Sequence, residues 1–285
     1  MTGRVGWRVP TRRLPTTLRV GGTILIGFFL VALTVPLWAP YSPVETVALP
    51  FEGASLDHPF GTDVLGRDVF TRVAYGTRID LLLSLTSTVI AVLLGAVIGL
   101  ASGYIGGWFD NVLMRAFEAI VSIPLLILAL LVIAAAGPQY SGSLLLLTAV
   151  VVLVYTPRVA RISRAVAVDL VTRDFLTVAR SRGESTWSIT RRELAPNASG
   201  VLLVEFGVRA GYAPILIGSL AFLGFGVRAP TPEWGLIISE NRAALATTPV
   251  VVLAPAAVLA ILIISLNLAT DGLARYLGRT AVRTP

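Results

Sequence analysis

The chain has no lysine, no cysteine and a single histidine, His58. A P-loop that binds nucleotide phosphates needs a lysine, as do a Schiff base and a serine-lysine dyad, so these sites are excluded. A zinc site of the H-E-x-x-H type, an iron-sulfur cluster and a disulfide framework need histidines or cysteines that the chain lacks. The sequence therefore predicts a protein that does not hydrolyse ATP by the common route and holds no cofactor or metal of its own.

Charged residues are also scarce. Only 14% of the 285 residues are charged and 55% are hydrophobic, whereas about a quarter of the residues in a soluble domain are charged. A membrane-spanning helix needs roughly 20 mostly apolar residues. The sequence predicts an all-α integral membrane protein with six transmembrane helices, over residues 21–39, 81–103, 117–136, 143–160, 199–222 and 248–270.

The basic residues are all arginines, and they are unevenly distributed between the predicted spans. Residues 1–20 hold five, the insert at 158–197 holds eight, and the chain beyond residue 271 holds three. Cytoplasmic loops of membrane proteins carry such an excess of basic residues. Both termini are therefore predicted to be cytoplasmic, and the segments 40–80 and 223–247 are predicted to be external.

Glycines recur every four residues along the end of the second predicted span, at Gly95, Gly99, Gly103 and Gly107. A stripe of small residues lets a second helix approach closely. We expect this stripe to serve helix packing, with a substrate groove as the alternative.

The cytoplasmic insert carries helix signals of its own. Asp174 can cap a short helix, and Gly183 lies where a left-handed residue would end it. Ser185 or Thr186 can then begin a second short helix, which Pro196 ends before the next span. The product is a helix-turn-helix on the cytoplasmic side of the membrane.

The second short helix would place Trp187, Arg191 and Leu194 on one face. An apolar stripe with a basic rim is typical of a surface that binds a partner protein. The alternative is a solvated loop in which Trp187 anchors in the lipid headgroup region. Spacing alone leaves both interpretations open.

This insert resembles a motif of a known family. Residues 174–197 are similar to the EAA loop of permease subunits of ABC importers, with Ala179, Gly183 and Pro196 in register. Thr177 stands where the family pattern has the glutamate of E-A-A, so a salt bridge made through that glutamate does not carry over.

Two further segments resemble the dipeptide/oligopeptide/nickel permeases. They are HPFGTDVLGRDVFTRVAYGTRIDL, at residues 58–81, and SLAFLGFGVRAPTPEWG, at residues 219–235. The chain is most similar to the second permease subunit of such importers, the one with an additional N-terminal span. The resemblance covers residues 20–275.

The resemblance implies a type I ABC importer permease fold with a cytoplasmic coupling helix. On this pattern residues 1–20 are a cytoplasmic tail, 21–80 hold the first span and the external segment, 81–271 form a core of five helices, and 272–285 are a second cytoplasmic tail. The coupling loop lies within the core, at residues 169–198.

The resemblance also implies partners. A second, homologous permease subunit would complete the pathway, one or two ATPase subunits would bind ATP and magnesium, and an external solute-binding lipoprotein would deliver the cargo. The protein would lie in the bacterial cytoplasmic membrane, in contact with lipid and with no nucleic acid. The residues expected to contact the ATPase are Thr177, Ala179, Gly183, Trp187, Arg191, Leu194 and Pro196.

Charged residues elsewhere have a structural and a functional interpretation. Glu205 and Arg209 lie four residues apart in the fifth span, where they can form an ion pair or contact substrate; either way they would line the pathway or a subunit interface. Asp63, Arg67 and Asp68 belong to the external GTDVLGRD segment. We expect the aspartates to tie local turns, with contact to the solute-binding protein as the alternative.

These observations predict a non-catalytic permease subunit that moves di- or oligopeptides by alternating access. Nickel chelates, haem or glutathione are alternative cargoes, because the binding protein does most of the selection in this family. A secondary transporter driven by an ion gradient would show inverted repeats and an acid at mid-membrane, and only Glu205 fits. An intramembrane enzyme would need paired catalytic residues at membrane depth, and the predicted spans hold neither histidine nor lysine.

Overall fold

The computed structural model describes the backbone of residues 14–281 and the side chains of residues 14–276. The predicted tails therefore lie partly outside the described residues. Within these limits the chain is helical and forms no β-sheet. In chain order the elements are α1 (Thr16–Trp38), α2 (Val69–Ile105), α3 (Gly107–Ser122), α4 (Leu125–Ala136), η1 (Pro138–Tyr140), α5 (Leu144–Val171), α6 (Asp174–Ser181), α7 (Thr186–Ile189), η2 (Thr190–Leu194), α8 (Ala195–Phe222), α9 (Trp234–Asn241), η3 (Arg242–Ala246) and α10 (Val250–Ala281).

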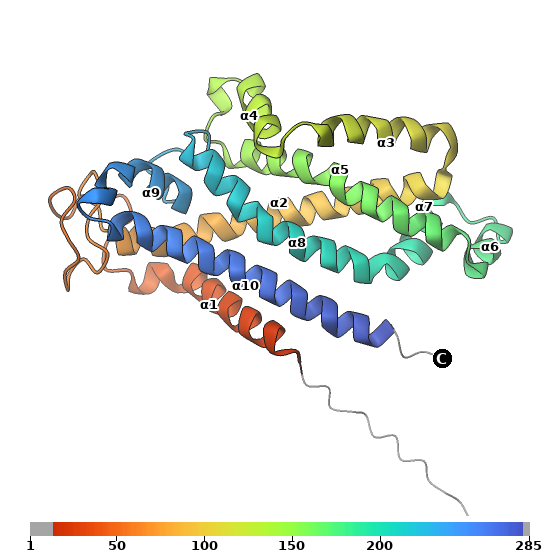
Figure 1. Cartoon of the computed structure of the whole chain (residues 1–285), viewed down its shortest axis with the longest axis horizontal. Helices are drawn as coiled ribbons and strands as arrows, with labels where there is room; N and C mark the ends of the chain where they lie inside the picture. The colour runs from red at the N-terminus through yellow and green to blue at the C-terminus, as the bar shows by residue number, and fades with distance from the viewer. Residues whose placement is uncertain (1–13, 282–285) are drawn as a thin grey trace, which may run out of the picture.

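The long helices run side by side as a bundle (Figure 1). The start of α1 and the end of α10 both point toward the end of the bundle at which α6 and α7 lie. The loop between α1 and α2 and the short helix α9 lie at the opposite end. This arrangement agrees with the orientation predicted from the arginines, with both termini and the α6–α7 segment on the cytoplasmic side.

Five helices are long and apolar enough to cross a membrane: α1, α2, α5, α10 and a continuous helix from Thr186 to Phe222. α3 and α4 count as a sixth span only when they are taken together, and the chain bends by 97° between them. The break follows from Pro124, which has no N–H to donate and which holds Ile123 in an extended conformation (φ −77°, ψ 130°). The unbroken helix predicted over residues 117–136 is therefore wrong, although the count of six holds when the pair is one span.

The second span begins earlier than its apolar run. α2 starts at Val69 because Asp68 caps it, accepting a hydrogen bond from the backbone N–H of Thr71 at 2.7 Å. The helix therefore begins within the predicted external segment 40–80. α5 and α10 also continue beyond their predicted ends, into the cytoplasmic side.

The glycine stripe of α2 packs against α5. A Cβ atom on Gly95 would lie 2.6 Å from Cβ of Val159, and Cβ atoms on Gly99 and Gly103 would collide with backbone carbonyl groups of α5. No real side chain tolerates such distances, so the predicted packing role is confirmed at these three positions. Gly107 differs: it begins α3, and the space around its Cβ position is open.

Candidate functional site

The first candidate site is the α6–α7 segment at the cytoplasmic end. Asp174 is the first residue of α6 and forms no side-chain cap, so the predicted capping is wrong. Gly183 follows α6 with a φ of 74°, the left-handed conformation expected of it. Ser185 caps α7 by accepting a hydrogen bond from the backbone N–H of Ser188 at 3.2 Å.

The second short helix does not end at Pro196. α7 passes through the π-helical turn η2 directly into α8, so one helix continues from Thr186 to Phe222. Pro196 is the second residue of α8, and its missing N–H falls just after the wider turn, where the hydrogen-bond register changes. The segment is therefore joined rigidly to a membrane-spanning helix.

One side of this segment is buried against the rest of the protein. Its apolar side chains form a cluster with α2, α5 and the start of α8, made by Leu100, Ala167, Leu176, Ala179, Ile189, Leu194 and Ala198. Leu194 thus points inward and does not share a face with Trp187 and Arg191, which are exposed. The prediction of one shared face is wrong because it assumed a regular α-helix, whereas η2 shifts the register.

The other side of the segment is open. Among the residues expected to contact an ATPase, those on this side are Thr177, Gly183, Trp187, Arg191 and Pro196. Trp187 is 59% exposed, and Val178, which sequence reasoning did not select, is 54% exposed. These two apolar side chains flank the turn at Gly183.

Ionic contacts fix the turn between α6 and α7. The Nη2 atom of Arg182 lies 2.8 Å from Oε1 of Glu184, and the hydroxyl of Ser188 donates a hydrogen bond of 2.9 Å to Oε2 of the same carboxylate. The bond from Ser188, together with Arg182, lowers the pKa of Glu184. The turn is therefore held in its shape by a carboxylate that stays ionised.

The second candidate site is a cavity of about 900 Å³ between α3, α5 and α8. Its charged lining residues are Arg158, Arg161, Arg164, Arg209, Glu118 and Asp169. The guanidinium of Arg164 is bound by Asp110 of α3, with Nε 2.7 Å from Oδ1. Asp110 therefore balances the positive charge of Arg164.

Glu205 and Arg209 form the ion pair that their spacing predicted. The Nη2 atom of Arg209 lies 2.9 Å from Oε2 of Glu205, and the side chains are 15% and 11% exposed. The guanidinium of Arg209 also faces the ring of Tyr155, 5.9 Å from its centroid. Arg209 belongs in addition to a smaller cavity of about 310 Å³ lined by Tyr155 and Tyr212. Arg209 thus lines both of these cavities along α8.

The third candidate site is an ionic network at the external end. Oδ2 of Asp63 accepts hydrogen bonds from Nε of Arg67, at 2.6 Å, and from Arg72. Oε2 of Glu240 accepts one from each of the same arginines, at 2.9 Å. The network connects the α1–α2 loop, the start of α2 and α9. Sequence reasoning missed Arg72 and Glu240, since Glu240 lies far along the chain from its partners.

Asp63, Arg67 and Asp68 are all buried. Asp68 caps α2, and its Oδ1 atom lies 3.1 Å from Nδ1 of His58. These contacts agree with the local structural role expected for the GTDVLGRD segment and leave these side chains no surface for a partner protein. In the part of the chain that the structure describes, no group of three histidines or acids is placed to hold a metal ion.

A second buried contact at the external end joins α9 to α2. The side chain of Glu233 caps α9, accepting hydrogen bonds from the backbone N–H groups of Gly235 and Leu236 at 2.8 and 2.7 Å. Nε1 of Trp234 donates to the carbonyl oxygen of Val73 at 2.8 Å. Burial raises the pKa of Glu233. Sequence reasoning did not single out either residue.

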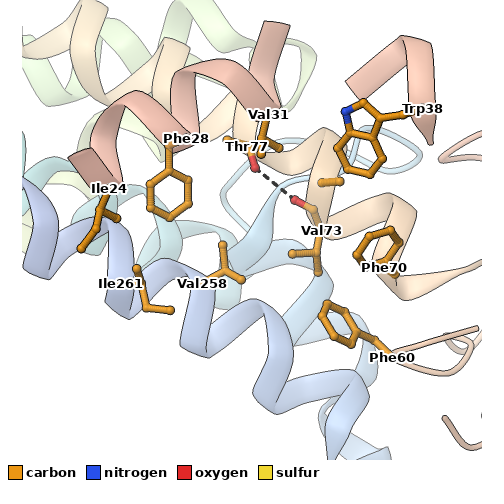
Figure 2. Close-up of a pocket in the computed structure, with 12 residues that line it drawn as sticks. Ile24, Phe28, Val31, Trp38, Phe60, Phe70, Val73, Thr77, Val258 and Ile261 are labelled. Carbon is orange, nitrogen blue, oxygen red and sulfur yellow. Dashed lines mark hydrogen bonds between the residues drawn. The ribbon is translucent and has the colours of Figure 1, made fainter. Parts of the chain in front are cut away.

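A further cavity, of about 440 Å³, lies between α1, α2 and α10. Figure 2 shows its lining, which includes Phe28, Trp38, Phe60 and Phe70. The hydroxyl of Thr77, in this lining, donates to the carbonyl oxygen of Val73 at 3.4 Å. None of its lining residues is charged, so this cavity lacks groups that would bind a charged cargo.

Comparison with known proteins identifies the family. A family model described as the binding-protein-dependent transport system inner membrane component matches residues 72–283. The chain belongs to this family. The permease is 32% identical to the dipeptide transport system permease protein of Alkalihalophilus pseudofirmus, over 94% of this chain and 88% of that protein.

Two other relatives are similar over most of their length. A putative peptide transport system permease protein of Brucella suis is 36% identical over 90% of this chain and 86% of its own. The glutathione transport system permease protein of Pectobacterium atrosepticum is 33% identical over 95% of this chain and 90% of its own. The predicted family, the all-helical permease fold and the location in the bacterial inner membrane are confirmed.

Proposed function

We propose that this permease is one of two membrane subunits of an ATP-driven importer and that its cargo is a peptide. The relatives support this class of cargo, since their names give dipeptides, peptides and glutathione. Glutathione is itself a tripeptide, so the three names describe one chemical class. The second, homologous permease subunit supplies the other half of the pathway.

The importer needs separate ATPase subunits and an external solute-binding protein. The chain has no lysine with which to build a P-loop, so ATP and magnesium are bound by the ATPase subunits and this permease carries no cofactor. The binding protein delivers the peptide to the external end of the bundle. In this arrangement the permease catalyses no reaction and supplies the pathway.

The observation that supports an ATPase contact is that one side of the α6–α7 segment is buried and the other side is exposed. Ala179 and Leu194 hold the segment to the body of the protein. Val178 and Trp187 are apolar and exposed at the cytoplasmic end, with Arg191 beside them on the continuous helix. Exposed aromatic side chains with a neighbouring arginine are typical of the centre of a protein interface.

The remaining coupling residues shape this surface or border it. Gly183 makes the turn that separates α6 from α7, and Thr177 and Pro196 are exposed on either side of it. Because the helix is continuous from Thr186 to Phe222, a displacement at Trp187 moves α8 as one body. Closure of the ATPase subunits then tilts a helix that lines the cavity.

The ATPase contact is tested in the complete importer with Trp187→Asp. We expect the ATPase subunits to copurify at least about tenfold less well, because an interfacial tryptophan contributes about 2 kcal/mol or more. Trp108→Asp is the matched control, since Trp108 is also exposed, at 79%, and lies in α3 outside the segment. Normal copurification and normal transport in a Trp187→Asp, Gly183→Pro double variant would refute the contact.

The cargo is tested by uptake into proteoliposomes. The complete importer, with its binding protein and ATP, is expected to accumulate radiolabelled dialanine or trialanine. Uptake should stop when ATP is omitted. If neither peptide is accumulated while the ATPase subunits remain associated and active, the peptide assignment is wrong and the coupling assignment stands.

A further inference from the structure

Two arginines lie at mid-length of two helices that line the cavity of about 900 Å³. Arg158 is at the midpoint of α5 and Arg209 at the midpoint of α8, each a helix of 28 residues. At 1.5 Å per residue, each arginine is about 20 Å from both ends of its helix. α5 runs toward the cytoplasmic end and α8 runs away from it (Figure 1), so the two arginines lie at the same depth.

The two arginines differ in how their charges are balanced. Arg209 is paired with Glu205 at 2.9 Å. Arg158 donates from Nη1 to the carbonyl oxygen of Val154 at 2.6 Å, and it forms no ion pair with any side chain of residues 14–276. A charged side chain at this depth costs free energy and needs a partner or a polar cavity. Arg158 therefore has an uncompensated positive charge where such a charge is expensive.

The positive charges are also close to one another. Arg161 and Arg209 each lie close enough to Arg158 to repel its charge. The Nε atom of Arg209 is buried and has no hydrogen-bond partner. A stable protein leaves few buried donors unpaired. Arg158 and Arg209 line one cavity, and Arg158 has no acidic partner among the described side chains, so its guanidinium is available for an anion.

The acids of the cavity balance its arginines only in part. Asp169 is paired with Arg173 at 3.1 Å, and Arg164 is bound by Asp110. Asp169 lies near the cytoplasmic end of α5, whereas Glu118 lies toward the opposite, non-cytoplasmic end of α3. The lining of the cavity therefore holds four arginines against two acids, an excess of positive charge.

We propose that Arg158 and Arg209 form a carboxylate-binding site that holds the C-terminal carboxylate of a peptide during its passage. The inference rests on the proposed peptide cargo. A guanidinium group presents its N–H donors in a plane that matches a carboxylate, and Tyr155 holds the guanidinium of Arg209 in place by stacking. The cavity of about 900 Å³ is in the size range of small-molecule sites. Glu205 limits the affinity, so that the carboxylate can leave.

The site is tested first by chemical protection, which needs no transport. Phenylglyoxal, which reacts with arginine, is applied to the purified complete importer in nanodiscs without binding protein or nucleotide, and modification is measured by mass spectrometry. Trialanine is expected to slow the modification of Arg158 at least about threefold, whereas trialanine amide leaves it unchanged. Arg115, exposed on α3 outside the cavity, serves as the internal reference. Equal modification with the acid and the amide would overturn the site.

Transport gives a second, independent measurement. Arg158→Gln is expected to lower trialanine uptake about tenfold or more, since hydrogen bonds to a charged group are strong. Arg158→Lys should recover part of the uptake, and Arg115→Gln should match the unaltered importer. Unchanged uptake in Arg158→Gln would overturn the inference. Absence of peptide uptake by the unaltered importer would refute the proposed cargo instead, a result that the protection experiment distinguishes.

Discussion

Replacing Asp63 by asparagine is expected to destabilise the external end of the permease. The carboxylate of Asp63 is fully buried and binds Arg67 and Arg72, which are themselves buried. Removing one partner of a buried ion pair costs about 3–5 kcal/mol, because the remaining charge is left uncompensated. Glu240, 18% exposed, still faces both arginines, so we expect the lower end of this range, about 3 kcal/mol.

The assay is thermal unfolding of the detergent-solubilised permease, followed by tryptophan fluorescence. A loss of about 3 kcal/mol corresponds to a fall in Tm of about 6–12 °C for a chain of this size class. Glu45→Gln is the matched control, because it removes the same charge from the same loop at an exposed position. If the Tm of Asp63→Asn falls no further than that of Glu45→Gln, the network does not stabilise the fold and the reasoning is refuted.

Two further predictions concern packing and pH. Gly99→Leu is expected to abolish monodisperse protein in gel filtration, because its side chain would collide with α5, whereas Gly22→Leu, in open space on α1, should be tolerated. Burial raises the pKa of Glu233 above its ordinary value of 4.5, so the folded protein binds this proton more tightly than the unfolded chain. The contribution of Glu233 to the free energy of unfolding is therefore fully present below this ordinary pKa, and it is lost as the pH rises through the raised pKa. Between about pH 4 and about pH 9, the Tm of Glu233→Gln should change less with pH than the Tm of the unaltered permease. An equal change in both proteins would contradict this.

The spans and the glycine stripe could be predicted because their signals are local. An apolar run of sufficient length identifies a span without information about the neighbouring helices. Gly95 and Gly99 lie on one face of their helix, and glycines spaced in this way indicate the close approach of a second helix. The turn at Gly183 was predictable for the same reason, since its conformation is set by a single residue. The ion pair of Glu205 and Arg209 followed from helical spacing alone.

The rest depended on information that a local pattern does not contain. Pro124 has apolar residues on both sides, so composition shows an unbroken span where the backbone turns. Leu194 points inward because the preceding helical turn is wider than an α-helical one, which spacing rules for a regular helix miss. Glu240 meets Arg67 only after the bundle has assembled. Arg158 looked like one of many cytoplasmic arginines until α5 proved to extend beyond its apolar run.

The attachment of α8 to α9 determines how the long helix can move. At the external end, the hydroxyl of Ser239 donates to the carbonyl oxygen of Phe222 at 2.9 Å, and Gly235 lies directly against the backbone of Gly218. The other end of the same continuous helix is at the cytoplasmic surface. A rod held at one end swings most at the other, so the external end acts as a fulcrum. A push at Trp187 therefore gives a large sideways excursion at the cytoplasmic mouth, about half of it at the membrane centre, and almost none where cargo enters.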